Sequence, residues 1–235
     1  MRGFLALYRR EIEYYFVTPI GYIIIGGFWL ASGFFFSFNT IFVSAVDMVG
    51  AFHNMSILLI LLVPIMSMRS FAEEYRLCTY ELLITLRIKH RSIVLAKFAG
   101  LLTIFMLMLM GSAASVSVLV LFSKPDLGPI LGGYLGIVLL GASFVAIGLV
   151  VSVFSTNQIV AAVVTWITLI GMWFLDYTEA LTTSKSLSQG IQYVSFSVRY
   201  HDLIRGIFDL GSAIYFLSVI ITCLVVACSV LQIRR

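Results

Sequence analysis

The sequence predicts an all-α membrane protein with six transmembrane helices. Hydrophobic residues make up 61% of the 235 residues, charged residues only 11%, and the mean hydropathy is +1.07. Soluble domains usually carry about 25% charged residues. The apolar residues are also gathered in runs of about 20, the length at which a helix crosses a bilayer. We therefore expect a single transmembrane domain over residues 1–235.

Six apolar runs qualify as spans: 20–42, 52–68, 98–122, 130–154, 159–176 and 211–232. The fourth and fifth runs are separated only by the four polar residues 155–158. Together they cover about 45 residues, too many for one crossing, so a tight turn is expected between them. Lys124-Pro125-Asp126 and Gly128-Pro129 mark the turn between the third and fourth spans.

Lysine and arginine are distributed unequally between the two sides that six spans define. The side with both termini holds eleven of them, and the other side holds only Lys124, Lys185, Arg199 and Arg205. The acidic residues divide almost evenly, five against six. Because cytoplasmic loops carry an excess of Lys and Arg, both termini are expected in the cytoplasm. The basic residues flank apolar runs and form no nucleic-acid-binding patch.

Residues 1–18 are expected to form an amphipathic helix. Its apolar residues recur at helical spacing: Phe4, Leu7, Tyr8, Ile12 and Tyr15. Such a helix would lie in the cytoplasmic interface until Pro19 turns the chain into the membrane. An equally supported alternative is a simple basic anchor that only orients the chain.

The longest charged segment, 69–97, separates the second and third spans and is expected to form two short helices. Within it, apolar residues available for one face are Tyr75, Leu82, Leu83 and Leu86, and the charged residues are Glu73, Glu74, Arg76 and Glu81. An apolar face outside the membrane needs to be covered by lipid headgroups or a partner. We favour a docking element over a solvated loop that only sets the topology.

Residues 177–210 form the longest external segment. A helix is expected over 198–208, and its charged residues Arg199, Asp202 and Arg205 are candidates for gating an exit path. An ordinary interfacial helix is the equally supported alternative.

The predicted span interiors contain no ionisable residue except His53, which we interpret as interfacial. This absence disfavours an ion-coupled carrier, because such carriers need intramembrane charged groups. The chain also lacks the common catalytic and nucleotide-binding motifs, so we expect no enzymatic activity, metal or cofactor of its own. Small residues at packing distance predict close helix contacts, in the fourth span at Gly132/Gly136, Ala142/Ala146 and Gly148/Ser152, and in the first at Gly26, Gly27 and Gly33.

The charged segment resembles the signature of ABC-2 type transporter permeases, approximately F-x-E-E-K/R-x-x-G-T-x-E-L-L-x-T-x-P. The matching residues are Phe71-Ala72-Glu73-Glu74, Thr79-Tyr80-Glu81-Leu82-Leu83-Ile84-Thr85-Leu86 and Ile93-Val94-Leu95-Ala96-Lys97-Phe98. The chain is most similar to the small gliding-motility and copper-processing accessory permeases, whose N-termini match 7–28. Two positions depart from the pattern: Cys78 stands for the glycine and Arg87 for the proline.

The resemblance implies the membrane half of an ATP-driven exporter in a bacterial inner membrane. Two such subunits, identical or paralogous, would pair with two copies of a cytoplasmic ATPase, which would bind ATP and magnesium. The residues implied to contact the ATPase are Phe71, Glu73, Glu74, Arg76, Thr79, Glu81, Leu82, Leu83 and Leu86. An alternative of another class is a membrane anchor or assembly platform that recruits a soluble partner without transport.

The substrate is left open by the sequence. Several aromatic residues either line an apolar or amphipathic path or fill the core and the interfacial belts by default, and the core interpretation is favoured: Phe34, Phe35, Phe36, Phe38, Trp166, Trp173 and Phe174.

Overall fold

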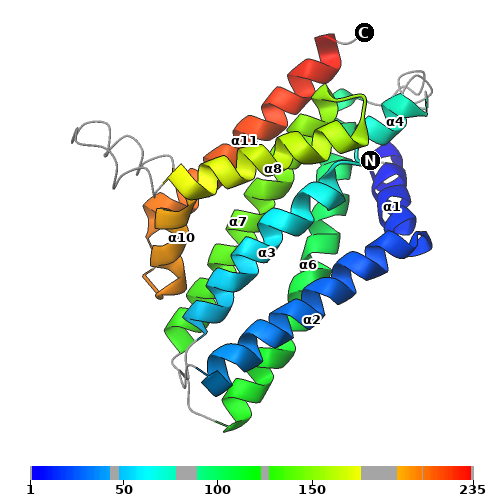
Figure 1. Cartoon of the computed structure of the whole chain (residues 1–235). Coiled ribbons are helices and arrows are strands. Elements are labelled where there is room, and N and C mark those ends of the chain that lie inside the picture. The colour runs from blue at the N-terminus through cyan, green and yellow to red at the C-terminus, as the bar shows by residue number, and fades with distance from the viewer. Residues whose placement is uncertain are drawn as a thin grey trace.

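The apolar runs of the sequence form long helices, because a backbone without water must satisfy its own hydrogen bonds. The structure is a computed structural model that describes residues 2–42, 48–77, 89–122, 127–175, 195–207 and 209–233. Every regular element in these ranges is a helix (Figure 1). The helices are α1 (Arg2–Val17), α2 (Pro19–Phe42), α3 (Val49–Ser67), α4 (Ala72–Arg76), α6 (His90–Phe122), α7 (Leu127–Phe154), α8 (Gln158–Phe174), α10 (Phe196–Ile204) and α11 (Leu210–Ile233).

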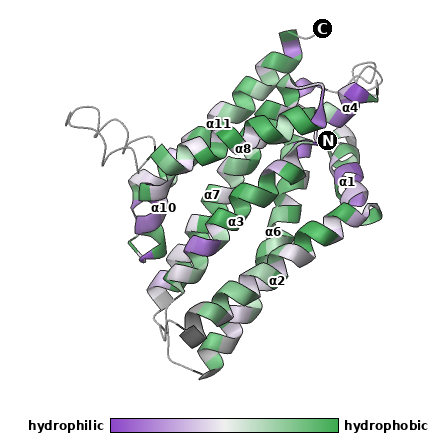
Figure 2. Ribbon diagram, in the orientation of Figure 1, coloured by the Kyte–Doolittle hydropathy of each residue, from purple (hydrophilic) through white to green (hydrophobic). Residues whose placement is uncertain are grey.

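Five of the described helices are long and apolar enough to cross a membrane: α2, α3, α6, α7 and α11. Figure 2 shows hydrophobic residues along these helices and hydrophilic stretches at α1, α4 and α10. The chain is therefore a multi-pass helical membrane protein. The predicted fifth span coincides with α8, an apolar helix of 17 residues. At 1.5 Å per residue α8 is about 25 Å long, a little less than the hydrocarbon core.

Helix α7 lies at the centre of the packing and contacts α3, α8, α10 and α11. Its small residues allow this, as the sequence predicts. A Cβ at Gly132 would overlap the carbonyl oxygen of Leu203 in α10, and one at Gly148 would overlap Ser67 at the end of α3. Between them, Ala142 and Ala146 pack against α11. Small side chains thus bring three neighbouring helices close to the backbone of α7.

The glycines of α2 behave differently from those of α7. A Cβ added at Gly26, Gly27 or Gly33 would meet no described atom within 4 Å. The prediction that these residues pack against other helices is therefore wrong for the described part of this chain. Helix α2 contacts α6 instead through Trp29, whose indole Nε1 donates to the Met108 carbonyl oxygen at 3.1 Å.

Each end of the helical body is fixed by its own set of contacts. Figure 1 places α1, α4 and both chain ends at one end. There α1 is fixed to the end of α3, where the Tyr15 hydroxyl donates to the Met66 carbonyl oxygen at 2.6 Å. At the opposite end, α10 lies against the start of α7, and Gly206 takes a positive φ of 81° directly beside Gly128 and Pro129. A side chain at position 206 would be strained in this conformation.

The contrast between the two sets of glycines gives a stability prediction. Gly132→Ala should lower the free energy of unfolding by about 1–3 kcal/mol, because the methyl group must displace the α10 backbone. Gly26→Ala should be neutral or stabilising by up to about 1 kcal/mol, because alanine favours the helix and meets open space. The apparent midpoint of thermal unfolding in detergent measures both variants. Equal unfolding midpoints for Gly132→Ala and Gly26→Ala would show that the backbone of α10 does not lie in contact with Gly132.

Candidate functional site

The first candidate site lies where α4 joins the membrane helices. Helix α4 follows α3 after a short turn and has only five residues. The backbone N–H groups of Phe71 and Ala72 donate to Ser152 Oγ of α7 at 3.0 and 3.1 Å. The same hydroxyl donates to the Met68 carbonyl oxygen at 3.2 Å. One serine of α7 therefore satisfies the free N–H groups at the start of α4 and fixes the preceding turn.

A buried lysine fixes the other side of α4. The Lys97 side chain, on α6, is 2% exposed. Its Nζ donates to Glu11 Oε1 at 2.5 Å, to Glu74 Oε1 at 2.9 Å and to the Ser70 carbonyl oxygen at 2.6 Å. A lysine ammonium has three donors, and all three are used here. We call Glu11, Glu74 and Lys97 the ion cluster; it joins α1, α4 and α6.

The surroundings of the ion cluster balance its charge. Two carboxylates and one ammonium leave an excess negative charge, and Arg10 and Arg69 line the same small pocket of about 110 Å³. The Phe71 ring centroid lies 5.0 Å from Lys97 Nζ, so its π-face adds a favourable contact for the cation. A buried charge needs such partners, because removing one of them leaves another charge uncompensated.

The rim of this pocket is formed by a tyrosine and its neighbours. The Tyr14 hydroxyl donates to both carboxylate oxygens of Glu73, at 3.0 and 2.9 Å, and accepts from Arg69 Nη1 at 3.3 Å. Partial burial, and then the hydrogen bond to Glu73, raise the pKa of Tyr14 above its ordinary value. Tyr14 therefore keeps its proton at neutral pH and links α1 to the outer side of α4.

The residues implied to contact an ATPase fall into three groups. Phe71 and Glu74 are buried within the chain, with exposed fractions of 0% and 8%, so in this conformation they hold α4 to the body. Glu73 is half-buried and Arg76 is exposed, as is its neighbour Leu77. The remaining predicted residues lie outside the described residues: Thr79, Glu81, Leu82, Leu83 and Leu86.

The ion cluster itself is not predicted by the sequence analysis. The third span was expected to start at residue 98, with Lys97 in the charged segment before it. Instead α6 begins at His90, so Lys97 lies inside this helix. The available signal is its sequence context, since a lone lysine in the apolar stretch 93–98 needs a buried carboxylate partner. Identifying Glu11 as that partner requires the tertiary contact of α1 with α6 at Gly100.

Of the predicted external residues, Arg199 and Asp202 lie on α10, and Arg205 directly follows it. This helix begins two residues before the predicted one, and its buried face rests on α7, α3 and α8. The Tyr200 hydroxyl donates to the Phe52 carbonyl oxygen of α3 at 2.8 Å. The Arg199 guanidinium lies 5.1 Å from the Tyr215 ring centroid, Asp202 is half-buried, and Arg205 is exposed. A gating role for Arg199, Asp202 and Arg205 stays a prediction.

The described histidines do not converge on one site. His53 lies at the α10 end, where its ring centroid is 6.4 Å from that of His201, whereas His90 begins α6. Within the described ranges, no group of three His, Cys, Asp or Glu side chains is placed to hold a metal ion.

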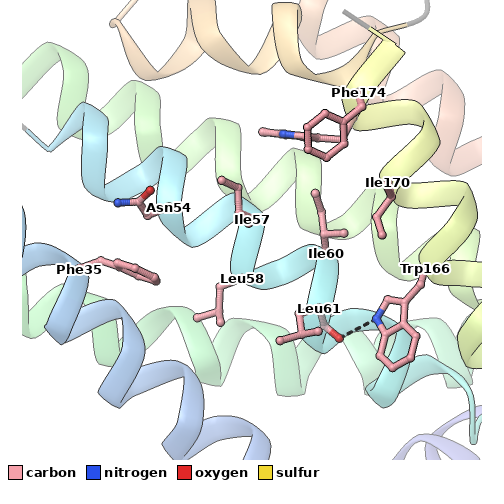
Figure 3. Close-up of a pocket in the computed structure, with 10 residues that line it drawn as sticks. Phe35, Asn54, Ile57, Leu58, Ile60, Leu61, Trp166, Ile170 and Phe174 are labelled. Carbon is pink, nitrogen blue, oxygen red and sulfur yellow. Dashed lines mark hydrogen bonds between the residues drawn. The ribbon is translucent and has the colours of Figure 1, made fainter. Parts of the chain in front are cut away.

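The second candidate site is an apolar groove of about 570 Å³ along α3, with walls from α2 and α8 (Figure 3). Among the described residues that line it, Asn54 is the only polar one. The Trp166 indole Nε1 donates to the Leu61 carbonyl oxygen at 3.0 Å, which fixes the α8 wall to the floor. Volume and lining are those of a site for an apolar or amphipathic ligand.

The aromatic residues noted in the sequence divide among this groove, the surface and the core. Those that line the groove are Phe35, Trp166, Trp173 and Phe174. Phe34 and Phe38 are 64% and 46% exposed on α2. The favoured core interpretation is therefore wrong for Phe34, Phe38 and Phe174, the last being 51% exposed. It holds for Trp173, which is 3% exposed, and Phe36 packs against the core.

Comparison with known proteins adds no identity to this geometry. No protein-family model matches the chain, and no curated protein matches it.

The ion cluster gives a second stability prediction. Lys97→Met keeps the length of the side chain but leaves the buried Glu74 and the partly buried Glu11 without their cation, and it should destabilise the protein by about 3–5 kcal/mol. Arg9→Gln is the matched control, because the exposed Arg9–Glu13 pair contributes less than about 1 kcal/mol. Thermal unfolding in detergent measures both.

A double-mutant cycle separates the pair from the rest of the cluster. Glu74→Gln removes one of the carboxylates, so the double variant Lys97→Met/Glu74→Gln should be more stable than the sum of the single changes implies. Additive effects would show that Lys97 and Glu74 are not in contact.

Proposed function

We propose that the chain is the membrane subunit of an ATP-driven exporter of the ABC-2 type, working with a separate cytoplasmic ATPase. The resemblance of residues 71–98 to the permease signature suggests the class. The observation that carries the proposal is the attachment of α4, which is buried against the membrane helices on one side and exposed at Arg76 and Leu77 on the other.

This attachment suits a short element that transmits force. A displacement of α4 would be transmitted to α6 and α1 through the ion pairs that Lys97 forms with Glu74 and Glu11. It would reach α7 through Ser152. Because these contacts are buried and hydrogen-bonded, α4 is expected to move together with the helices rather than slide over them. The predicted docking surface is then the exposed side of α4 with the following residues 78–88.

The proposed topology has six spans, with α8 as the fifth, and both termini in the cytoplasm. Five helices long enough to cross are described, and α8 falls within the range of lengths seen for spans, roughly 17–25 residues. The distribution of basic residues supports the orientation, since cytoplasmic segments carry the excess of Lys and Arg. The inner membrane of a bacterium is the location that the resemblance suggests.

The substrate path in this proposal is the apolar groove between α2, α3 and α8. It lies open on one side of a single chain, and a second permease subunit would close it. Its lining suits an apolar or amphipathic substrate. ATP-driven movement of α4 would change the packing between two arrangements of the helices. A platform that only recruits a partner would need the docking surface but not this groove.

Docking is tested by charge reversal at the exposed end of α4. Arg76→Glu and Leu77→Asp should abolish co-purification with an ABC ATPase whose reading frame adjoins that of this chain, and should remove any stimulation of its ATP turnover by the chain. Leu83→Asp should do the same if 78–88 contributes. Arg9→Glu, exposed on α1, is the control and should leave both unchanged. If none of the three changes weakens assembly or ATP turnover, the docking role of this segment is wrong.

The orientation is tested by thiol labelling in sealed vesicles. With Cys223 and Cys228 replaced by alanine, Cys78 should react with a membrane-impermeant maleimide only from the cytoplasmic side. Arg205→Cys in the same background, with Cys78 also replaced, should react only from the opposite side. Labelling of both positions from one side would contradict the six-span topology.

A further inference from the structure

A second groove, of about 380 Å³, lies between the start of α6 and the end of α11. Its α6 wall consists of Arg91 and Leu95, which are one helical turn apart. Its α11 wall consists of two rows of residues spaced by four: Ile221, Val225 and Ser229 in one, and Leu224, Cys228 and Gln232 in the other. This spacing places both rows on one face of α11.

The polarity of the groove changes along its length in the same direction on both helices. On α11, each row begins with aliphatic residues and ends with a polar one, Ser229 or Gln232. On α6, Arg91 comes first and Leu95 lies one turn further into the bundle. The polar end therefore lies at the end of the body that carries both chain ends, and the apolar end points toward the middle of the membrane helices (Figure 1).

The dimensions match one leaflet of a bilayer. Between Ile221 and Gln232 the helix rises about 16 Å, and half of the hydrocarbon core is about 15 Å. The apolar lining is open to the surroundings, with exposed fractions of 45% for Leu95, 60% for Ile221 and 58% for Val225. Side chains of this kind on membrane-crossing helices contact acyl chains, and the polar end then lies at headgroup level.

The positive charge of Arg91 at the polar end of the groove favours an anionic headgroup. Arg91 is exposed and forms no ion pair with any residue that the structure describes. A guanidinium binds a phosphate through two parallel hydrogen bonds, and the Gln232 amide lines the same end as a further donor. No carboxylate is part of the described lining, so the electrostatic preference is for an anion.

We propose that this groove is a binding site for one anionic phospholipid. The phosphate group contacts Arg91 and Gln232, and one acyl chain lies between α6 and α11 against Leu95, Leu224 and Val225. Under the proposed orientation, this lipid belongs to the inner leaflet. Basic pockets between membrane helices on the cytoplasmic side are known positions for anionic headgroups. The site is independent of ATP-driven transport and stands if that proposal fails.

The test is native mass spectrometry of the detergent-purified chain titrated with phosphatidylglycerol or with phosphatidylcholine of the same acyl chains. The wild-type chain should retain one phosphatidylglycerol in preference to phosphatidylcholine. Arg91→Gln should weaken phosphatidylglycerol binding roughly fivefold, the effect of about one interfacial basic residue. Lys89→Gln, an exposed neighbour outside the groove, should change it less than twofold.

A second pair of variants tests the acyl chain. Val225→Trp fills the groove and should remove the bound lipid, although Arg91 is intact. Val226→Trp adds the same bulk to α11 outside the lining and should leave binding unchanged. Thermal unfolding of each variant serves as the control that the fold is retained. Glycerol 3-phosphate and inorganic phosphate, which carry the anion without a chain, should not displace the lipid.

Each contrary result overturns the proposal. Equal retention of the two lipids, or equal weakening by Arg91→Gln and Lys89→Gln, would mean that general surface charge accounts for binding. Displacement by glycerol 3-phosphate together with normal binding to Val225→Trp would identify a free-anion site. A wild-type dimer that becomes a monomer in Val225→Trp but not in Val226→Trp would identify a second copy of the chain as the occupant.

Discussion

The arrangement of the end of the helical body that carries α1 and α4 depends on the burial of one ammonium group. A lysine charge removed from water is costly unless every donor finds an acceptor, and Lys97 finds them on α1, on α4 and in the turn before α4. Helix α4, with five residues, is too short to be stable alone. Its position therefore follows from the ion cluster on one side and Ser152 on the other. The same requirement fixes α1 beside α6, which a purely apolar contact would leave free to slide.

The packing of the membrane helices is unequal around α7. In the apolar 18-residue stretch of α7, 72% is buried inside the protein. In the corresponding stretches of α2 and α11, only 22% is buried. Small residues on α7 allow its neighbours to approach, and the large side chains of those neighbours fill the space. The outer helices are consequently covered on one side only. This inequality explains why both apolar grooves lie beside α2 or α11 and neither lies beside α7.

The helices could be predicted because a membrane leaves the backbone few alternatives. All six apolar runs of the sequence coincide with helices in the described ranges. Pairwise contacts could not be predicted in the same way. Small residues predict close helix contacts in both spans, but of Gly26 and Gly132 only Gly132 has a helix against it. Similarly, Glu73 and Glu74 are adjacent in one motif, yet Glu74 is buried against Lys97 of α6, whereas Glu73 is half-buried and accepts a hydrogen bond from Tyr14 of α1. Long-range partners of this kind are properties of the tertiary structure.

Two helices connect the features on which the proposed function depends. Both α7 and α8 contact α4 at one end and α10 at the other. Helices α7 and α8 are joined by a tight turn, in which the Asn157 side chain accepts a hydrogen bond from the Ile159 N–H at 2.9 Å. The two helices are therefore consecutive in the chain and packed together. Helix α8 also supplies one wall of the apolar groove. A contiguous set of packed helices is a physical route for coupling distant sites. In the proposed exporter, movement of α4 would therefore shift the groove wall and α10 together, because α7 and α8 contact both α4 and α10 and α8 is itself that wall.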